Sequence, residues 1–543
     1  MSTYITDKDH PFSIVTFIPV EPKPDIPLLG SWLPEGIIQT RERKVMVAAT
    51  DALVYEGKPT FDDSIEQVLV HKEVSGVGTN NFVINLVART DEKGLTWDKK
   101  IIPNDLVVIQ MIRPKEDKIM KTMMVGLVQE VLRNTEVKGT PEKPVVRRSV
   151  TIKGFDVSGI FTHHTIFNAA NYLVSYGKLP DDIKKITAVH LGIFLAEREE
   201  EAISGRTVND MIKYVLDEYL SESLSSARIG SLSDLPIFDL IDYSNLNNDK
   251  TFKEREGEPL KIFGFDYLSL SGPSFAEFML QLLQIPFNEI VTRYEDFSVS
   301  LLENRINMIT EDIITANNIP KMRFVVRASP FKFDPGVPYN RLYEDGGSVD
   351  ERKEDEHGFE IQTHHIDDED VVSETIGRTN HRTYNMFLTA PRSQMAIGMH
   401  PALNVHPAYD REKIKRYGFK FNITPLDYFN IGPTREFQSR GVTGTEASYG
   451  AYGADLLIPA ITTASYLSNV LKQWFIRENE FIKGEITIKG IASIREGDFL
   501  EYKSKEMGLT LKAYIEAVDH VFVNFDSYTT SLTISRGTVE DLA

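Results

Sequence analysis

The stretch GDFLEYKSKEMGLTLKAYIEAVDHVFVNFDSYTTSLTISRG, residues Gly497–Gly537, repeats an order of features that also occurs near the N-terminus. Asn104-Asp105 begins an apolar strand, as Gly497-Asp498 does. Two further segments correspond in order: Met124–Val128 with Tyr514–Val518, and Val150–Gly154 with Leu532–Gly537. Strand patterns separated by turn residues predict a meander of antiparallel strands. Two small barrels or sandwiches of related design would explain the repeat. The alternative is that any two meanders share the order strand, turn, strand.

The bulk composition is that of an ordinary globular chain, with 543 residues, 41% hydrophobic and 26% charged. At this length we expect about three to five domains. A formal net charge of −19 argues against a dedicated nucleic-acid binder, whose affinity rests on Lys and Arg. The chain has no cysteine, which excludes disulfides, thiolate zinc sites, iron–sulfur clusters and a cysteine nucleophile. We expect no membrane anchor and no signal peptide.

The changes of pattern along the chain predict a multidomain α+β fold. It consists of two related small antiparallel β-barrels near the N- and C-termini with a mostly helical middle domain. The helical prediction rests on apolar residues at three- and four-residue steps in TVNDMIKYVLDEYL, and on SFAEFMLQLLQIPF and EIVTRYEDFSVSLLENRINMITEDII. The predicted domains are 1–155, the first tube-like β-barrel; 156–320, mostly helical; 321–440, mixed β with an acidic loop at 344–370; and 441–543, a connecting segment, an amphipathic helix and the second β-barrel.

The sequence contains no recognisable catalytic motif: neither a phosphate-binding loop nor a GxSxG nucleophile elbow is present. Metal candidates are His357, His364 and His365, which stand among Asp367, Asp368, Glu369 and Asp370. Adjacent histidines on a strand point to opposite faces, so their spacing does not suit one ion. We expect His163 and His164 at the start of a helix, and Tyr449, Tyr452, Tyr466 and Trp474 in packing. We therefore predict no catalytic, cofactor-binding or metal-binding residues, and no enzyme.

Several segments resemble central hub proteins of phage tail baseplates. The closing segments IKGIASIREGDFLEY and AYIEAVDHVFVNFDSYTTSLTISRG look like the C-terminal barrel of that family, and RSVTIKGFDVSGIF is similar to the end of its first barrel. RASPF at Arg327–Phe331 and DVVSETIGRTNHRTYNMF at Asp370–Phe387 resemble its middle region. The resemblance covers both ends and the centre of the chain.

The resemblance implies a structural role in the virion, within a tail baseplate assembled in the host cytoplasm. Three copies would form a ring, and two related barrels per copy would create six similar positions. Such a homotrimer would join a sixfold tail tube to a threefold cell-puncturing spike. The implied partners are the tail tube protein or tube initiator, the spike or tail lysin protein, the tape-measure protein and other baseplate proteins. DNA would pass through the ring without specific binding, since acidic walls repel phosphate.

Two other hypotheses remain open at this point. The chain is another tail component, such as a tube or tube-adaptor protein, or it is a metal-dependent wall-degrading hydrolase that uses the residues between His357 and Asp370. The acidic loop either binds calcium or keeps the particle soluble.

Overall fold

The structure is a computed structural model, and the residues it describes lie in separate segments. These segments are 11–22, 45–50, 54–55, 58–59, 62–89, 95–113, 120–140, 143–163, 208–221, 227–229, 237–247, 274–283, 288–295, 319–328, 361–379, 383–391, 407–426, 467–469, 471–506, 508–524 and 526–541.

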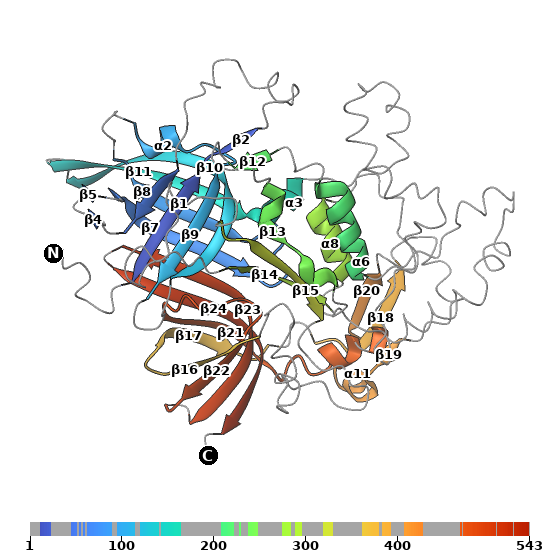
Figure 1. Ribbon diagram of the computed structural model, residues 1–543. Coiled ribbons are helices and arrows are strands. Elements are labelled where there is room, and N and C mark those ends of the chain that lie inside the picture. The colour runs from blue at the N-terminus through green and yellow to red at the C-terminus, as the bar shows by residue number, and fades with distance from the viewer. Residues whose placement is uncertain are drawn as a thin grey trace, which may run out of the picture.

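One 14-stranded sheet contains strands from both ends of the chain (Figure 1). Its N-terminal half runs in the order β7-β8-β11-β10-β9-β1-β3-β6, and its C-terminal half in the order β17-β21-β24-β23, with β22 and β16 branching from β23. The N-terminal strands are β1 (Phe12–Ile18), β3 (Met46–Ala49), β6 (Asp62–Asp63), β7 (Ile65–Glu73), β8 (Asn81–Val87), β9 (Leu106–Ile112), β10 (Lys121–Thr140) and β11 (Lys143–Asp156). The C-terminal strands are β16 (Thr363–Asp367), β17 (Val371–Gly377), β21 (Ile482–Lys489), β22 (Phe499–Ser504), β23 (Leu509–Val523) and β24 (Ser527–Asp541).

Strand β23 joins the two halves because it is long enough to pair with two strands along the same edge. Its first part, Leu509–Tyr514, pairs with β22, and its second part, Ala517–Val523, pairs antiparallel with β7. β24 pairs along the other edge of β23. The β7–β23 ladder satisfies backbone groups that each half would otherwise present at an open edge.

The two meanders β9-β10-β11 and β22-β23-β24 share a detailed backbone geometry. Each begins with a residue of positive φ, +73° at Asn104 and +80° at Gly497. Asn104 N donates to Val128 O at 2.7 Å and Val128 N to Asp105 O at 2.9 Å; the corresponding bonds from Gly497 N to Ile515 O and from Ile515 N to Asp498 O measure 2.8 and 3.0 Å.

A β-bulge follows directly in both meanders, between Val128 and Glu130 and between Ile515 and Ala517. A bulge inserts one residue and bends the strand at a fixed place, so its recurrence is a specific shared feature. The backbone therefore equates Val128 with Ile515, three residues away from the correspondence that the sequence patterns suggested.

The two largest hydrophobic cores lie against this sheet. The C-terminal strands curl around Ile486, Leu500, Leu511, Leu532 and other apolar side chains. The N-terminal strands share a larger core with a middle layer of short elements. That layer consists of α3 (Ile160–His163), α6 (Val208–Val215), α8 (Phe275–Leu283) and a sheet of order β13-β15-β14, formed by β13 (Ile241–Asp242), β14 (Asn288–Tyr294) and β15 (Met322–Ala328).

A small separate sheet of order β19-β18-β20 lies on one flank of the molecule (Figure 1). Its strands are β18 (Met386–Pro391), β19 (Ala408–Tyr409) and β20 (Phe421–Leu426), and α11 (Arg411–Tyr417) connects β19 to β20. The Asp410 side chain caps α11 by accepting from Lys413 N at 2.9 Å. The remaining elements are α2 (Trp97–Lys100), the pair β2 (Val20–Pro22) and β12 (Ala227–Ile229), and the pair β4 (Val54–Tyr55) and β5 (Lys58–Pro59).

The predicted fold class is wrong in two respects. The described residues hold five short α-helices and no helical middle domain, and the two predicted separate barrels are halves of one large, mostly antiparallel curled sheet. The sequence predicts a helix from Glu289 onward, yet Glu289–Tyr294 belong to β14 (Asn288–Tyr294), in which all seven residues are buried. A strand covered on both faces loses the period-two pattern that would identify it. The two predicted barrels form one sheet because the edge of β7 pairs with β23.

Replacing Gly497 tests the turn that begins the second meander. A Cβ there would lie 2.8 Å from both Arg327 Nη2 and Val291 Cγ1, at a φ of +80°. Gly508 has φ +65° but open space around it, so Gly508→Ala introduces only left-handed strain, about 1 kcal/mol. We expect Gly497→Ala to lower the free energy of unfolding by about 3 kcal/mol, because steric conflict adds to the strain. Chemical denaturation of both variants measures the difference; equal losses would contradict this description of the turn.

Candidate functional site: a buried charge cluster at the junction of the two halves

Six charged side chains gather beside the β7–β23 ladder, and we call them the junction cluster. They come from β7, from β14 and β15 of the middle layer, and from the turn before β22. All six are buried: Lys72, Glu289, Arg293, Arg327, Glu496 and Asp498. The loop after β7 brings these elements together, since Val74 N donates to Glu516 O at 2.8 Å and Ser75 N donates to Ile290 O at 2.7 Å.

Glu496 is the centre of the cluster, with a side chain that is 0% exposed. Its Oε1 lies 3.0 Å from Lys72 Nζ of the N-terminal half and 2.8 Å from Arg293 Nη1 of the middle layer. Lys72 Nζ also donates to Thr292 O at 2.7 Å and lies 4.8 Å from the centre of the Tyr294 ring. One carboxylate therefore links cations from two parts of the chain to the turn that opens the C-terminal meander.

Asp498 extends the cluster toward β16. Its Oδ1 lies 3.4 Å from Arg293 Nη2, and its Oδ2 lies 3.0 Å from His364 Nε2. Gln362 N donates to Oδ1 at 3.4 Å. The aspartate of the Gly497-Asp498 pair thus holds both the turn and strand β16 in place.

Glu289 and Arg327 form the second buried ion pair. Arg327 Nε donates to Glu289 Oε1 at 2.6 Å, and Arg327 Nη2 donates to Gly497 O at 2.8 Å. Tyr514 of β23 donates its hydroxyl hydrogen to Glu289 Oε2 at 2.7 Å. The neighbouring strands β14 and β15 therefore hold the C-terminal meander at its opening turn and at β23.

The cluster is balanced, with three cations and three carboxylates removed from water together. Burial lowers the pKa of Lys72 to about 8, although Glu496 opposes that shift. Burial would also lower the pKa of Arg327, but the Glu289 carboxylate outweighs it and the pKa is raised. Removing one member of a buried pair leaves an uncompensated charge, which costs about 3–5 kcal/mol. This arrangement suits a structural clamp, because its polar groups are directed at one another.

A second buried carboxyl, Asp156 at the end of β11, faces the same region. Burial raises its pKa to about 6, against hydrogen bonds donated by Ser158 Oγ and by Asn80 Nδ2 at 3.0 Å. Tyr294 O–H also donates to Asp156 at 3.4 Å. Asp156 therefore holds the end of the first meander against β14, as Asp498 holds the start of the second.

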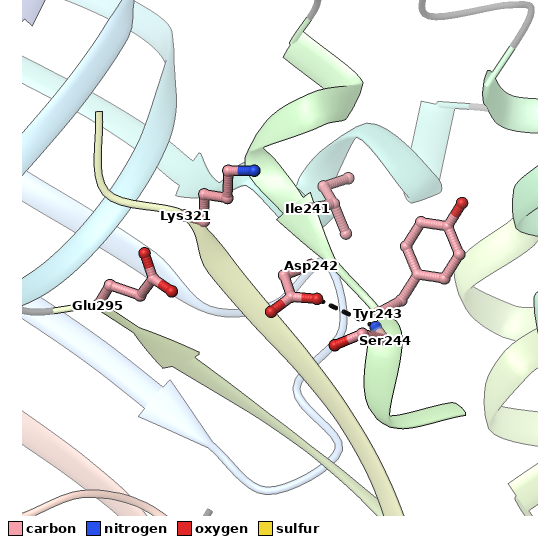
Figure 2. Close-up of a pocket in the computed structure, with 6 residues that line it drawn as sticks. All are labelled: Ile241, Asp242, Tyr243, Ser244, Glu295 and Lys321. Atoms are coloured by element: carbon pink, nitrogen blue, oxygen red, sulfur yellow. Dashed lines mark hydrogen bonds between the residues drawn. The ribbon is translucent and has the colours of Figure 1, made fainter. Parts of the chain in front are cut away.

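An open depression lies near the ends of β13, β14 and β15 (Figure 2). Its lining residues are Ile241, Asp242, Tyr243, Ser244, Glu295 and Lys321. Asp242 accepts from Ser244 N at 3.0 Å and lies 3.4 Å from Arg323 Nε, while Arg323 Nη2 lies 3.4 Å from Glu295. Burial raises the pKa of Asp242, but the Ser244 and Arg323 contacts outweigh it, and the net shift is downward. The two carboxylates that line the depression, Asp242 and Glu295, are thus both engaged by the Arg323 guanidinium.

His364 and His365 point apart, as strand alternation predicts. His364 faces Asp498, whereas the His365 side chain is 63% exposed and lies 3.5 Å from Glu501. Asp368 accepts from Lys505 N at 2.7 Å and from Tyr502 O–H at 3.0 Å. Within the described residues no group of three or more His, Asp or Glu has a metal-binding arrangement.

Other residues singled out in the sequence have varied positions. His357, His164, Tyr449, Tyr452 and Tyr466 lie outside the described residues. His163 ends the short helix α3, and Trp474 is buried beneath Arg536, whose guanidinium carbon lies 3.3 Å from the ring centre. Residues 363–367, which belong to the predicted acidic loop 344–370, form strand β16 instead.

Sequence reasoning missed the junction cluster. Only two local signals exist: Glu496 directly precedes the Gly497-Asp498 turn, and Arg327 begins the RASPF segment. Neither indicates its partner, because Lys72 and Glu289 lie far away in the sequence. In the part of the chain that the structure describes, no helix combines the length and the apolar character needed to span a membrane.

Comparison with known proteins gives structural matches alone. No protein-family model and no curated protein matches the chain. A tail protein from Neisseria meningitidis MC58 aligns over 88% of this chain and 94% of its own, with 9% identity and a TM-score of 0.40. The 43 kDa tail protein of prophage MuSo2 from Shewanella oneidensis has the same coverage and identity, with a TM-score of 0.39. A chain of the p2 virion baseplate in its activated conformation aligns over 87% of this chain and 88% of its own length, with 11% identity and a TM-score of 0.25. The three matched structures are thus a tail protein, a prophage tail protein and a virion baseplate.

His520 of β23, opposite Val70 of β7, provides a pH test of the junction. Ile494 O can only accept, so Nε2 donates to it at 3.2 Å, and Nδ1 accepts from Tyr528 O–H at 3.1 Å. Burial lowers the His520 pKa to about 3. Between about pH 6.5 and 3 the unfolded chain therefore binds a proton that the folded chain does not, and stability falls as pH falls.

We expect His520→Gln to remove that part of the acid sensitivity. The free energy of unfolding of the wild type should fall relative to the variant by about 1.4 kcal/mol per pH unit within this window. Denaturant titrations from pH 7 to pH 4 measure both curves. Parallel curves would contradict a neutral, buried His520.

Proposed function

We propose that this chain is a structural component of a phage tail baseplate, a central hub that works as a homotrimer. Three copies form a ring that joins a sixfold tail tube to a threefold spike. The ring encloses the channel through which the tape-measure protein and DNA pass. Other baseplate proteins and the tail tube protein are the partners that this function requires.

The observation that carries the proposal is the duplicated meander within one continuous sheet. Both copies begin with a positive-φ residue before a buried aspartate and continue into the same bulge. Because the β7–β23 ladder fixes the two copies in one body, three chains would present six related meanders. Closed rings need the same heterologous contact repeated around the axis, and a duplicated unit supplies six similar positions from three chains.

The charge of the chain supports the channel in this proposal. With a formal net charge of −19 on each chain, a ring of these chains carries a large negative charge. Repulsion between acidic walls and phosphate allows DNA to pass without adhering. The junction cluster has a matching mechanical role, since a load on one half reaches the other through buried ion pairs.

The experiment is light scattering of the purified protein at micromolar concentration, followed by electron microscopy of the same peak. We expect a mass of three chains, each of 61.6 kDa, and rings that show three copies with six similar lobes. Hexameric rings or polymerised tubes would favour a tube or tube-adaptor protein instead. A stable monomer would contradict the hub.

A further inference from the structure

One surface of the molecule collects exposed apolar and basic side chains. Of the eleven large hydrophobic side chains that are exposed among the described residues, five lie between Tyr409 and Ile423. Residues 409–423 also hold five Lys and Arg against two acidic residues, although the whole chain is strongly acidic. We call residues 409–423 the basic strip.

The apolar part of the basic strip follows one face of an edge strand. Phe421 and Ile423 of β20 are 54% and 60% exposed, and Phe419, two residues before the strand begins, is 66% exposed. The rings of Phe419 and Phe421 are stacked with their centres 5.9 Å apart. In the described structure β20 pairs with β18 alone, which leaves its other edge without a neighbouring strand. Apolar surface beside an open strand edge marks a site of protein association.

A second open edge has the opposite charge. Residues 367–377, which we call the acidic edge, hold five acidic residues and no Lys or Arg. Strand β17 pairs only with β21 among the described strands, and Val372 in it is 58% exposed. Glu374 on the same strand is exposed as well.

The two surfaces lie on opposite flanks of the molecule. In Figure 1, β17 lies within the group of C-terminal strands at the lower left, while β20 and α11 lie to the right of that group. β17 has seven residues and β20 has six, so the open edges match in length. Different complementary patches on two sides of one chain are what a closed heterologous ring requires.

We propose that the basic strip of one copy docks on the acidic edge of the next copy, with β20 placed along β17. The inference rests on the proposed trimer and names the surfaces that close it. Backbone groups at both edges gain partners, apolar side chains such as Phe421 and Val372 leave water, and opposite charges set the register.

Two double variants test the two surfaces separately. Phe421→Glu with Ile423→Glu damages the basic strip, and Val372→Lys with Glu374→Lys damages the acidic edge. All four side chains are exposed, so the fold should persist, which circular dichroism checks. We expect each variant alone to fall from the mass of three chains to the single-chain mass of 61.6 kDa.

An equimolar mixture of the two variants is the decisive sample. Each variant retains the surface that the other lacks, so one intact contact can form and the ring cannot close. Light scattering should therefore show a one-to-one dimer. The matched control is Val137→Lys with Val146→Glu, an exposed pair on the β10–β11 hairpin, which should remain a trimer.

A charge-only variant, Arg411→Glu with Lys420→Glu, keeps the apolar face intact. It should raise the dissociation constant of the trimer at least tenfold, which a dilution series measures. If either double variant remains a trimer, or if the equimolar mixture stays monomeric, the proposed contact between β20 and β17 is wrong. Neither result contradicts the proposed hub. A wild-type chain that does not form a trimer overturns both. Capture of an acidic partner protein or of nucleic acid by the basic strip in place of a second copy would likewise overturn it.

Discussion

The mutual arrangement of the two halves and the middle layer depends on the ion pairs of Glu496. This carboxylate is fully buried and lies between Lys72 of the N-terminal half and Arg293 of the middle layer, directly before the turn that opens the C-terminal meander. A buried charge is tolerated only where its partners are held in place, so the three parts must keep one mutual arrangement. Burial lowers the pKa of Lys72 to about 8, because its side chain is only 6% exposed. The β7–β23 ladder joins the two halves, and the junction cluster in addition fixes their relative orientation.

The duplicated meander explains why the junction between the two halves would need to be rigid. Two related units that moved independently would not offer regularly spaced positions to neighbours. Here Asp498 and Asp156 secure the second and the first meander to the middle layer, through Arg293 and through Tyr294 respectively. Both anchors are residues of β14, a strand buried along its whole length. In the proposed ring, this junction would transmit force between the two halves of each chain without bending.

Sequence patterns predicted local features well and long-range contacts poorly. The apolar run Leu106–Ile112 is a strand whose seven residues are all buried, and the repeated order of strands is real. The predicted helical middle domain is wrong, because the burial of β14 on both faces removes the alternation that marks a strand. The junction cluster was missed for a different reason: nothing near Glu496 in the sequence names Lys72 as its partner. Likewise, the open edges of β7 and β23 carry no local signal that they pair with each other.

Native-state hydrogen exchange tests most directly whether the two halves form one body. Under conditions that favour global opening, amides in the middle of β10 and of β23 should exchange with the same opening free energy, because the β7–β23 ladder and the junction cluster couple the halves. Exchange of the β9-β10-β11 amides through an opening that leaves β22-β23-β24 protected would contradict the account.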